Sequence, residues 1–98
     1  MATTTERLQA ARAKIDSARA AVDHDAGASP VLVAVVLVFA RKADKAAAST
    51  DERVAVIELE QAGDSAKAAA EADPDLGEAA LQAVEDAHLA ICILKTEV

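Results

Sequence analysis

Hydrophobic residues recur near the start of the chain at alternating spacings of three and four, the period of an α-helix with one buried face. Thr3 and Glu6 fit a capping box, in which each side chain satisfies a free amide of the first turn. Gly27 is expected to stop the helix. The pattern predicts a first helix over residues 3–25, with an apolar stripe made of Leu8, Ala11, Ile15, Ala18 and Val22.

Helix-start signals divide the rest of the chain into three further helices. Ser29-Pro30 and Asp73-Pro74 each combine an N-cap with proline at the first helical position, where a missing amide costs nothing. Ser49 and Glu52 fit a second capping box. We therefore predict a single all-α domain over residues 1–98, an up-down-up-down bundle of helices at about 3–25, 30–48, 50–72 and 74–97.

Three segments rich in β-branched residues support a different fold. Residues 31–39, 53–60 and 90–98 have the composition of buried strands, and the second segment partly alternates. An α/β protein with these three strands is the alternative. The helix-start signals stand in the expected places, and hairpin turns such as Asn-Gly are absent from the sequence, so the all-α fold is favoured.

Some apolar residues of the predicted helices fall on faces that should be polar in a monomer. In the fourth helix, the polar face that contains Asp86 continues into Leu89 and Ile93. In the third helix, Ile57 takes an outward position, and Val54 does so more marginally. In the second helix, the charged side of the C-terminal half projects back onto Val31, Ala34, Leu37 and Val38.

Contiguous outward apolar residues mark an interface. The bundle places the end of the fourth helix beside the start of the third, so Ile57, Leu89 and Ile93 are expected to form one outward patch. The second-helix surface lies toward the opposite end. We assign both surfaces to copies of the same chain, which predicts a homo-oligomer. The alternatives are a second helix enclosed within the monomer, or a module that binds a heterologous protein.

Composition supports association and excludes several partners. The chain is 53% hydrophobic but has a single aromatic residue, Phe39, so its core is built from small aliphatic side chains and a lone copy is marginally stable. The net charge of −7 opposes binding to nucleic acid and to anionic lipid. The longest apolar run, residues 31–40, is about half of the ~20 residues that cross a membrane. We expect neither nucleic acid nor membrane as a partner.

A lone cysteine and the start of the chain indicate a cellular setting. Cys92 cannot form an intrachain disulfide, and the polar N-terminus shows no secretory signal. The expected setting is reducing and cytoplasmic.

Asp23-His24-Asp25 gathers a base and two acids, but it lies where the first helix ends and all three side chains can be solvated. The main candidate chemistry lies in His88 and Cys92, four residues apart on one predicted helix. This spacing points two ligands toward one metal, but zinc needs about four and no second His/Cys pair exists in the sequence. As a nucleophile and base, the pair lacks an identifiable oxyanion hole and third group. With only 3 glycines, the chain has no phosphate-binding loop. We predict no enzyme activity, cofactor, metal or small-molecule substrate, and a packed His88 beside an inert thiol.

The whole chain resembles computationally designed homo-oligomeric helical bundles. The resemblance rests on general features of such designs and not on a family motif. These features are the capping pairs Thr3/Glu6 and Ser49/Glu52, the Ser29-Pro30 and Asp73-Pro74 helix starts, short loops and abundant alanine. The resemblance implies that assembly itself is the function.

Overall fold

All four helices are present in the computed structural model, which describes residues 3–97. No strand occurs in this range, so the α/β alternative is wrong. Its three segments lie in helices, apart from the end of 90–98, where Glu97 caps a helix and Val98 lies outside the described residues. Val36, Val56 and Ile91 of these segments serve here as core residues at helical spacing, because strand propensity reflects fit to a packed surface rather than a backbone requirement. The helices are α1 (Thr4–Asp23), α2 (Pro30–Ala47), α3 (Glu52–Glu71) and α4 (Glu78–Thr96).

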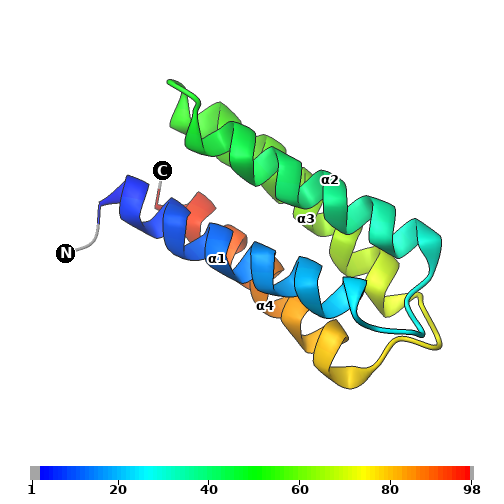
Figure 1. Cartoon of the computed structure of the whole chain (residues 1–98). Coiled ribbons are helices and arrows are strands. Elements are labelled where there is room, and N and C mark those ends of the chain that lie inside the picture. The colour runs from blue at the N-terminus through cyan, green and yellow to red at the C-terminus, as the bar shows by residue number, and fades with distance from the viewer. Residues whose placement is uncertain (1–2, 98) are drawn as a thin grey trace.

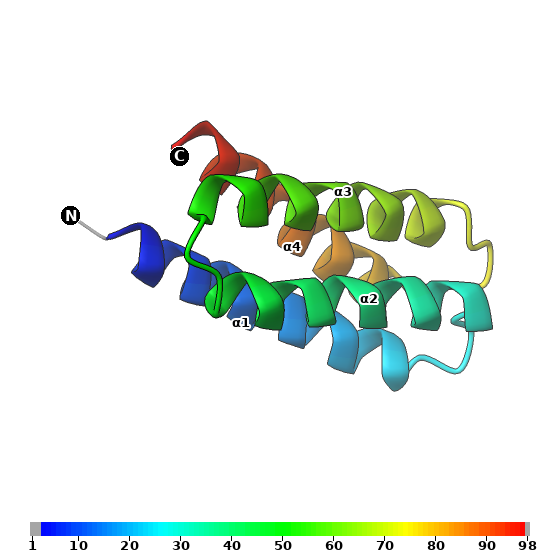
Figure 2. The same ribbon diagram turned by 90° about the horizontal axis from the view of Figure 1, so that it is seen from above.

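The helices form a square up-down-up-down bundle of about 38 × 22 × 18 Å. Each helix packs against two neighbours, α1 and α3 each lying between α2 and α4, while the diagonal pairs α1/α3 and α2/α4 do not pack within the described residues. The α1–α2 and α3–α4 loops meet at one end (Figure 1). The α2–α3 loop, the start of α1 and the end of α4 lie at the other end (Figure 2). No helix in residues 3–97 has the length and apolarity needed to cross a membrane.

One continuous core fills the bundle, and the predicted stripe of α1 belongs to it. Phe39 is the largest fully buried side chain. A Cβ atom at Gly63 would lie 3.1 Å from Cζ of Phe39, so the glycine makes room for the ring. The stripe residues Leu8, Ala11, Ile15, Ala18 and Val22 are all at most 7% exposed.

Two of the predicted helix starts are confirmed. The Thr3 side chain accepts a hydrogen bond from the amide of Glu6 at 3.1 Å. Ser29 caps α2 in the same way through the amide of Leu32 at 3.2 Å, with Pro30 at the first helical position.

The other two predicted starts are wrong. The N-cap of α3 is Asp51, whose side chain accepts from the amide of Val54, while Ser49 bonds to the Asp51 backbone instead. Helix α4 begins at Glu78 after the N-cap Gly77, four residues later than the Asp73-Pro74 signal indicated. The Asp73 carboxylate is committed to loop amides, so the cap chemistry is present but stabilises a loop.

Gly27 does not stop α1 as predicted. The helix ends at Asp23 with His24 as its C-cap in right-handed backbone geometry, and no residue of the described range has positive φ. The reason for glycine is close approach: a Cβ atom here would overlap the backbone carbonyl of Asp75 in the other loop. Gly27 therefore lets two loops touch.

Two aspartates hold these loops together by reciprocal hydrogen bonds. Asp25 accepts from the amide of Gly27 at 2.8 Å and, across to the second loop, from the amide of Gly77 at 2.9 Å. Asp73 accepts from the amide of Asp75 at 3.3 Å and, across to the first loop, from the amide of Ser29 at 2.8 Å. Each carboxylate binds one amide of its own loop and one of the other.

This reciprocity reflects an internal repeat with a spacing of 48 residues. Residues 16–25 (DSARAAVDHD) match residues 64–73 (DSAKAAAEAD), and both copies carry an i,i+4 ion pair, Arg19–Asp23 and Lys67–Glu71. The first hairpin, α1–α2, and the second hairpin, α3–α4, are therefore copies of one framework. Three sets of helix caps obey the spacing: Thr3 and Asp51, His24 and Ala72, and Ser29 and Gly77.

Candidate interaction surface

The predicted surface on α2 is largely outward-facing. Val31 is 68% exposed, Val38 is 48% exposed, and Ala34 is also exposed. Leu37 is half-buried. A helix turns about 100° per residue, so Leu37 lies well round the helix from Val38. The free apolar surface on α2 therefore consists of Val31, Ala34 and Val38.

The predicted patch of Ile57, Leu89 and Ile93 is divided in the structure. Leu89 and Ile93 are 57% and 52% exposed and line a groove of about 460 Å³ between α4 and α1. Ile57 is half-buried on α3 and does not line that groove. The outward apolar surface at this site is the α4 pair together with exposed Ala10 of α1.

The internal repeat places a second groove between α2 and α3, and its chemistry differs. This groove is lined by Lys45, Lys42 and Glu58. In the repeat, these residues are equivalent, in that order, to Ile93, Ala90 and Ala10 of the first groove. Both lysine Nζ atoms lie 3.9 Å from Glu58 Oε2, and the groove has about half the volume, 230 Å³. At these three positions the framework therefore accepts either a set of paired charges or a set of apolar side chains.

The same contrast extends along the outer faces of α2 and α4. Five exposed positions on each helix, spaced by three and four residues, are related by the 48-residue repeat. We call them the α2 stripe (Val31, Ala34, Val38, Arg41 and Lys45) and the α4 stripe (Ala79, Gln82, Asp86, Leu89 and Ile93). The α2 stripe is apolar and then basic. The α4 stripe begins with Ala79, continues with polar Gln82 and acidic Asp86, and is then apolar.

The repeat is the signal that sequence reasoning missed. Without it, the fourth helix suggested only an isolated mismatch at Leu89 and Ile93. With it, the ten positions form two equivalent rows whose polarity is reversed at four of the five paired positions, Val31 and Ala79 both being apolar. The DSA segments at residues 16–18 and 64–66 were the visible sign of the repeat.

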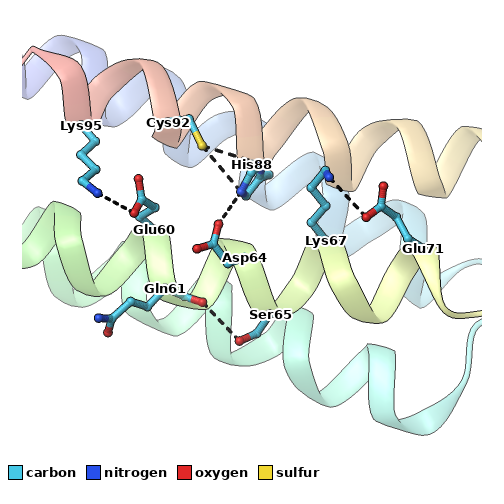
Figure 3. A network of polar contacts seen from close by, with 9 residues as sticks. All are labelled: Glu60, Gln61, Asp64, Ser65, Lys67, Glu71, His88, Cys92 and Lys95. Atoms are coloured by element: carbon cyan, nitrogen blue, oxygen red, sulfur yellow. Dashed lines mark hydrogen bonds and ion pairs between the residues drawn. The ribbon is translucent and has the colours of Figure 1, made fainter.

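His88 and Cys92 lie at the α3–α4 seam, with Asp64 opposite them (Figure 3). His88 Nε2 is 2.6 Å from Asp64 Oδ1, and Cys92 Sγ is 3.6 Å from the same ring nitrogen. Burial raises the pKa of the Cys92 thiol, and the charges of Glu60 and Asp64 raise it further. The raised pKa disfavours the thiolate, which is the form that acts as a nucleophile or a metal ligand.

The neighbouring polar groups of this seam are paired with one another. Lys95 Nζ lies 2.8 Å from Glu60 Oε1, and this contact raises the pKa of the lysine. In residues 3–97, no group of three or more His, Cys, Asp or Glu side chains is arranged to hold a metal ion. The arrangement is that of ion pairs and a packed histidine tying two helices together.

Comparison with protein-family models, curated proteins and solved structures finds no match to this chain.

Proposed function

We propose that this protein is a structural helix bundle that associates with copies of itself and carries out no catalysis. One observation carries the proposal: four large aliphatic side chains on the outer faces of α2 and α4 are between 48% and 68% exposed. They are Val31, Val38, Leu89 and Ile93.

The fold itself does not require these residues to be apolar. At the positions equivalent to Leu89 and Ile93 the first hairpin has Arg41 and Lys45, and at the position equivalent to Val38 the second hairpin has Asp86. Apolar side chains held in water at sites where the same framework accepts charge are best explained by burial against another molecule. The resemblance to designed homo-oligomeric bundles supports the same proposal.

Size-exclusion chromatography with light scattering tests this function. We expect a mass above that of the 10.0 kDa monomer at micromolar concentration. A control variant, Ala13→Gln with Ala68→Gln, changes exposed residues outside both stripes and should keep the wild-type mass. A strictly monomeric wild type would contradict self-association and favour the alternative, in which the same faces bind a different protein.

A further inference from the structure

The two stripes are complementary to each other and not to themselves. Each has an apolar end, and the remaining side chains are basic on α2 (Arg41 and Lys45) and, apart from Ala79, polar or acidic on α4 (Gln82 and Asp86). Two α2 stripes aligned in parallel oppose like charges, and aligned antiparallel over their full length they oppose cations to valines. Shifted so that only the valines meet, they leave Arg41 and Lys45 without a partner in the facing stripe. The α4 stripe has the same difficulty with its own copy. Like-charge contacts and desolvated, unpaired charges both disfavour a complex.

An antiparallel pairing of an α2 stripe with an α4 stripe removes these conflicts. In one register, Val38 faces Leu89 and Ala34 faces Ile93, while Val31 lies opposite Thr96, so two apolar pairs form. In the same register, Arg41 faces Asp86. Arg41 makes no ion pair within residues 3–97, and Asp86 bonds only to Gln82 of its own helix, at 2.8 Å, so both remain accessible to a partner.

The helix dipole alone does not explain this pattern. It favours acidic residues near the start of α4 and basic residues near the end of α2. It gives no reason for Val31 and Val38 at one end of the first row, or for Leu89 and Ile93 at the opposite end of the second. Complementarity with another copy accounts for Ala34, Val38 and Arg41 of the first row and for Asp86, Leu89 and Ile93 of the second.

One chain cannot pair its own stripes, because α2 and α4 are diagonal in the bundle and both rows face outward. We propose that the α2 stripe of one chain packs antiparallel against the α4 stripe of a second copy. This inference rests on the proposed self-association and specifies its geometry. The contact is head-to-tail, so each added copy leaves one free stripe of each kind, and assembly continues into a ring or filament.

Two variants that each block one stripe test the geometry. The chain supplies the substitutions, since each variant takes residues from the equivalent positions of the other hairpin. Ala34→Gln with Val38→Asp blocks the α2 stripe, and Leu89→Arg with Ile93→Lys blocks the α4 stripe. All four positions are exposed, and circular dichroism with thermal unfolding checks that both variants remain folded.

Each blocked variant alone is expected to be monomeric by light scattering. An equimolar mixture is expected to form a one-to-one dimer of twice the 10.0 kDa monomer mass, because one variant keeps the α4 stripe and the other keeps the α2 stripe. If either variant alone keeps the wild-type oligomer, or if the mixture stays monomeric while the wild type associates, the head-to-tail geometry is wrong and self-association stands. A monomeric wild type overturns the proposed function itself.

A charge exchange within the mixture tests the register. Adding Arg41→Glu to the variant that keeps the α2 stripe should weaken the dimer about tenfold, because two acidic side chains then meet. Adding Asp86→Arg to its partner should restore most of the affinity. Failure of the second change to rescue the first would exclude the register in which Arg41 faces Asp86.

Discussion

The first and second hairpins share helix caps and loop hydrogen bonds, but they differ in the side chains on their outer faces. Helix caps and loop carboxylates recur at a spacing of 48 residues, as with Asp25 and Asp73. The outer faces of α2 and α4 have opposite polarity at four of five equivalent positions. Features that both hairpins share are those that the bundle needs in order to fold. Positions at which the two hairpins differ are those where the fold accepts more than one kind of side chain. The apolar outer residues belong to the positions that differ, and this is why we attribute them to interaction.

The largest expected change in stability comes from replacing Phe39, a large core residue that packs against a glycine of the other hairpin. Phe39 packs against Gly63, whereas the equivalent positions in the other half are Ala87 and Ile15. Phe39→Ala should lower the free energy of unfolding by about 3–4 kcal/mol, since it leaves a cavity beside a glycine. Adding Gly63→Ile reproduces the residue pair of the other half and should recover at least ~1 kcal/mol in urea unfolding. No recovery would mean that the two halves are not equivalent in packing.

The next largest change in stability is expected from breaking the contact between the α1–α2 loop and the α3–α4 loop. Gly27→Ala should destabilise the protein by about 2 kcal/mol, because its Cβ overlaps the carbonyl of Asp75 and the loops must separate. Asp75 occupies the equivalent position in the second loop, and its side chain is exposed. Asp75→Ala is therefore the matched control and should change stability by no more than about 0.5 kcal/mol. Equal effects in thermal unfolding would contradict a steric role specific to Gly27.

The sequence predicts the helices well because their information is local. The α1 stripe and the caps Thr3 and Ser29 depend on residues within one or two turns, and all are confirmed. The errors arise where tertiary contacts compete with a local signal. Asp73 has the chemistry of an N-cap, but its carboxylate binds Ser29 of the other loop, so α4 starts later.

Only part of the candidate surface could be predicted from the sequence, because that surface also depends on tertiary contacts. Periodicity identifies an outward position on a helix, which suffices for Val31, Leu89 and Ile93. It does not specify which helix borders that position, so Ile57 was grouped with residues whose groove it does not line. The complementarity between the stripes depends on the repeat, and the hydrophobic periodicity of single helices does not reveal a spacing of 48 residues.

The reciprocal loop bonds predict two equal and coupled effects. Asp25→Ala and Asp73→Ala each remove two hydrogen bonds to a carboxylate and should each cost about 1–2 kcal/mol. The double variant should lose less than the two losses added together, since separated loops no longer gain from the remaining carboxylate. Asp16→Ala, which removes an exposed carboxylate of α1, is the control. Additive losses in chemical unfolding would show that the two aspartates act independently.

The smallest expected effect concerns Cys92, whose equivalent in the first hairpin is Asp44. Asp44 pairs with Arg12 at 2.5 Å, but the position equivalent to Arg12 is Glu60, so the second hairpin has an anion near the thiol. Burial and then this charge raise the pKa of Cys92 in the folded protein. Alkylation by iodoacetamide should therefore be slower when folded than in urea, and Glu60→Gln should speed it by on the order of twofold.

The unfolded thiol ionises first as pH rises, so Cys92 contributes stability that declines above its ordinary pKa. The alkaline decline of stability should be shallower in Cys92→Ala; identical pH profiles would mean that the thiol environment does not change on folding.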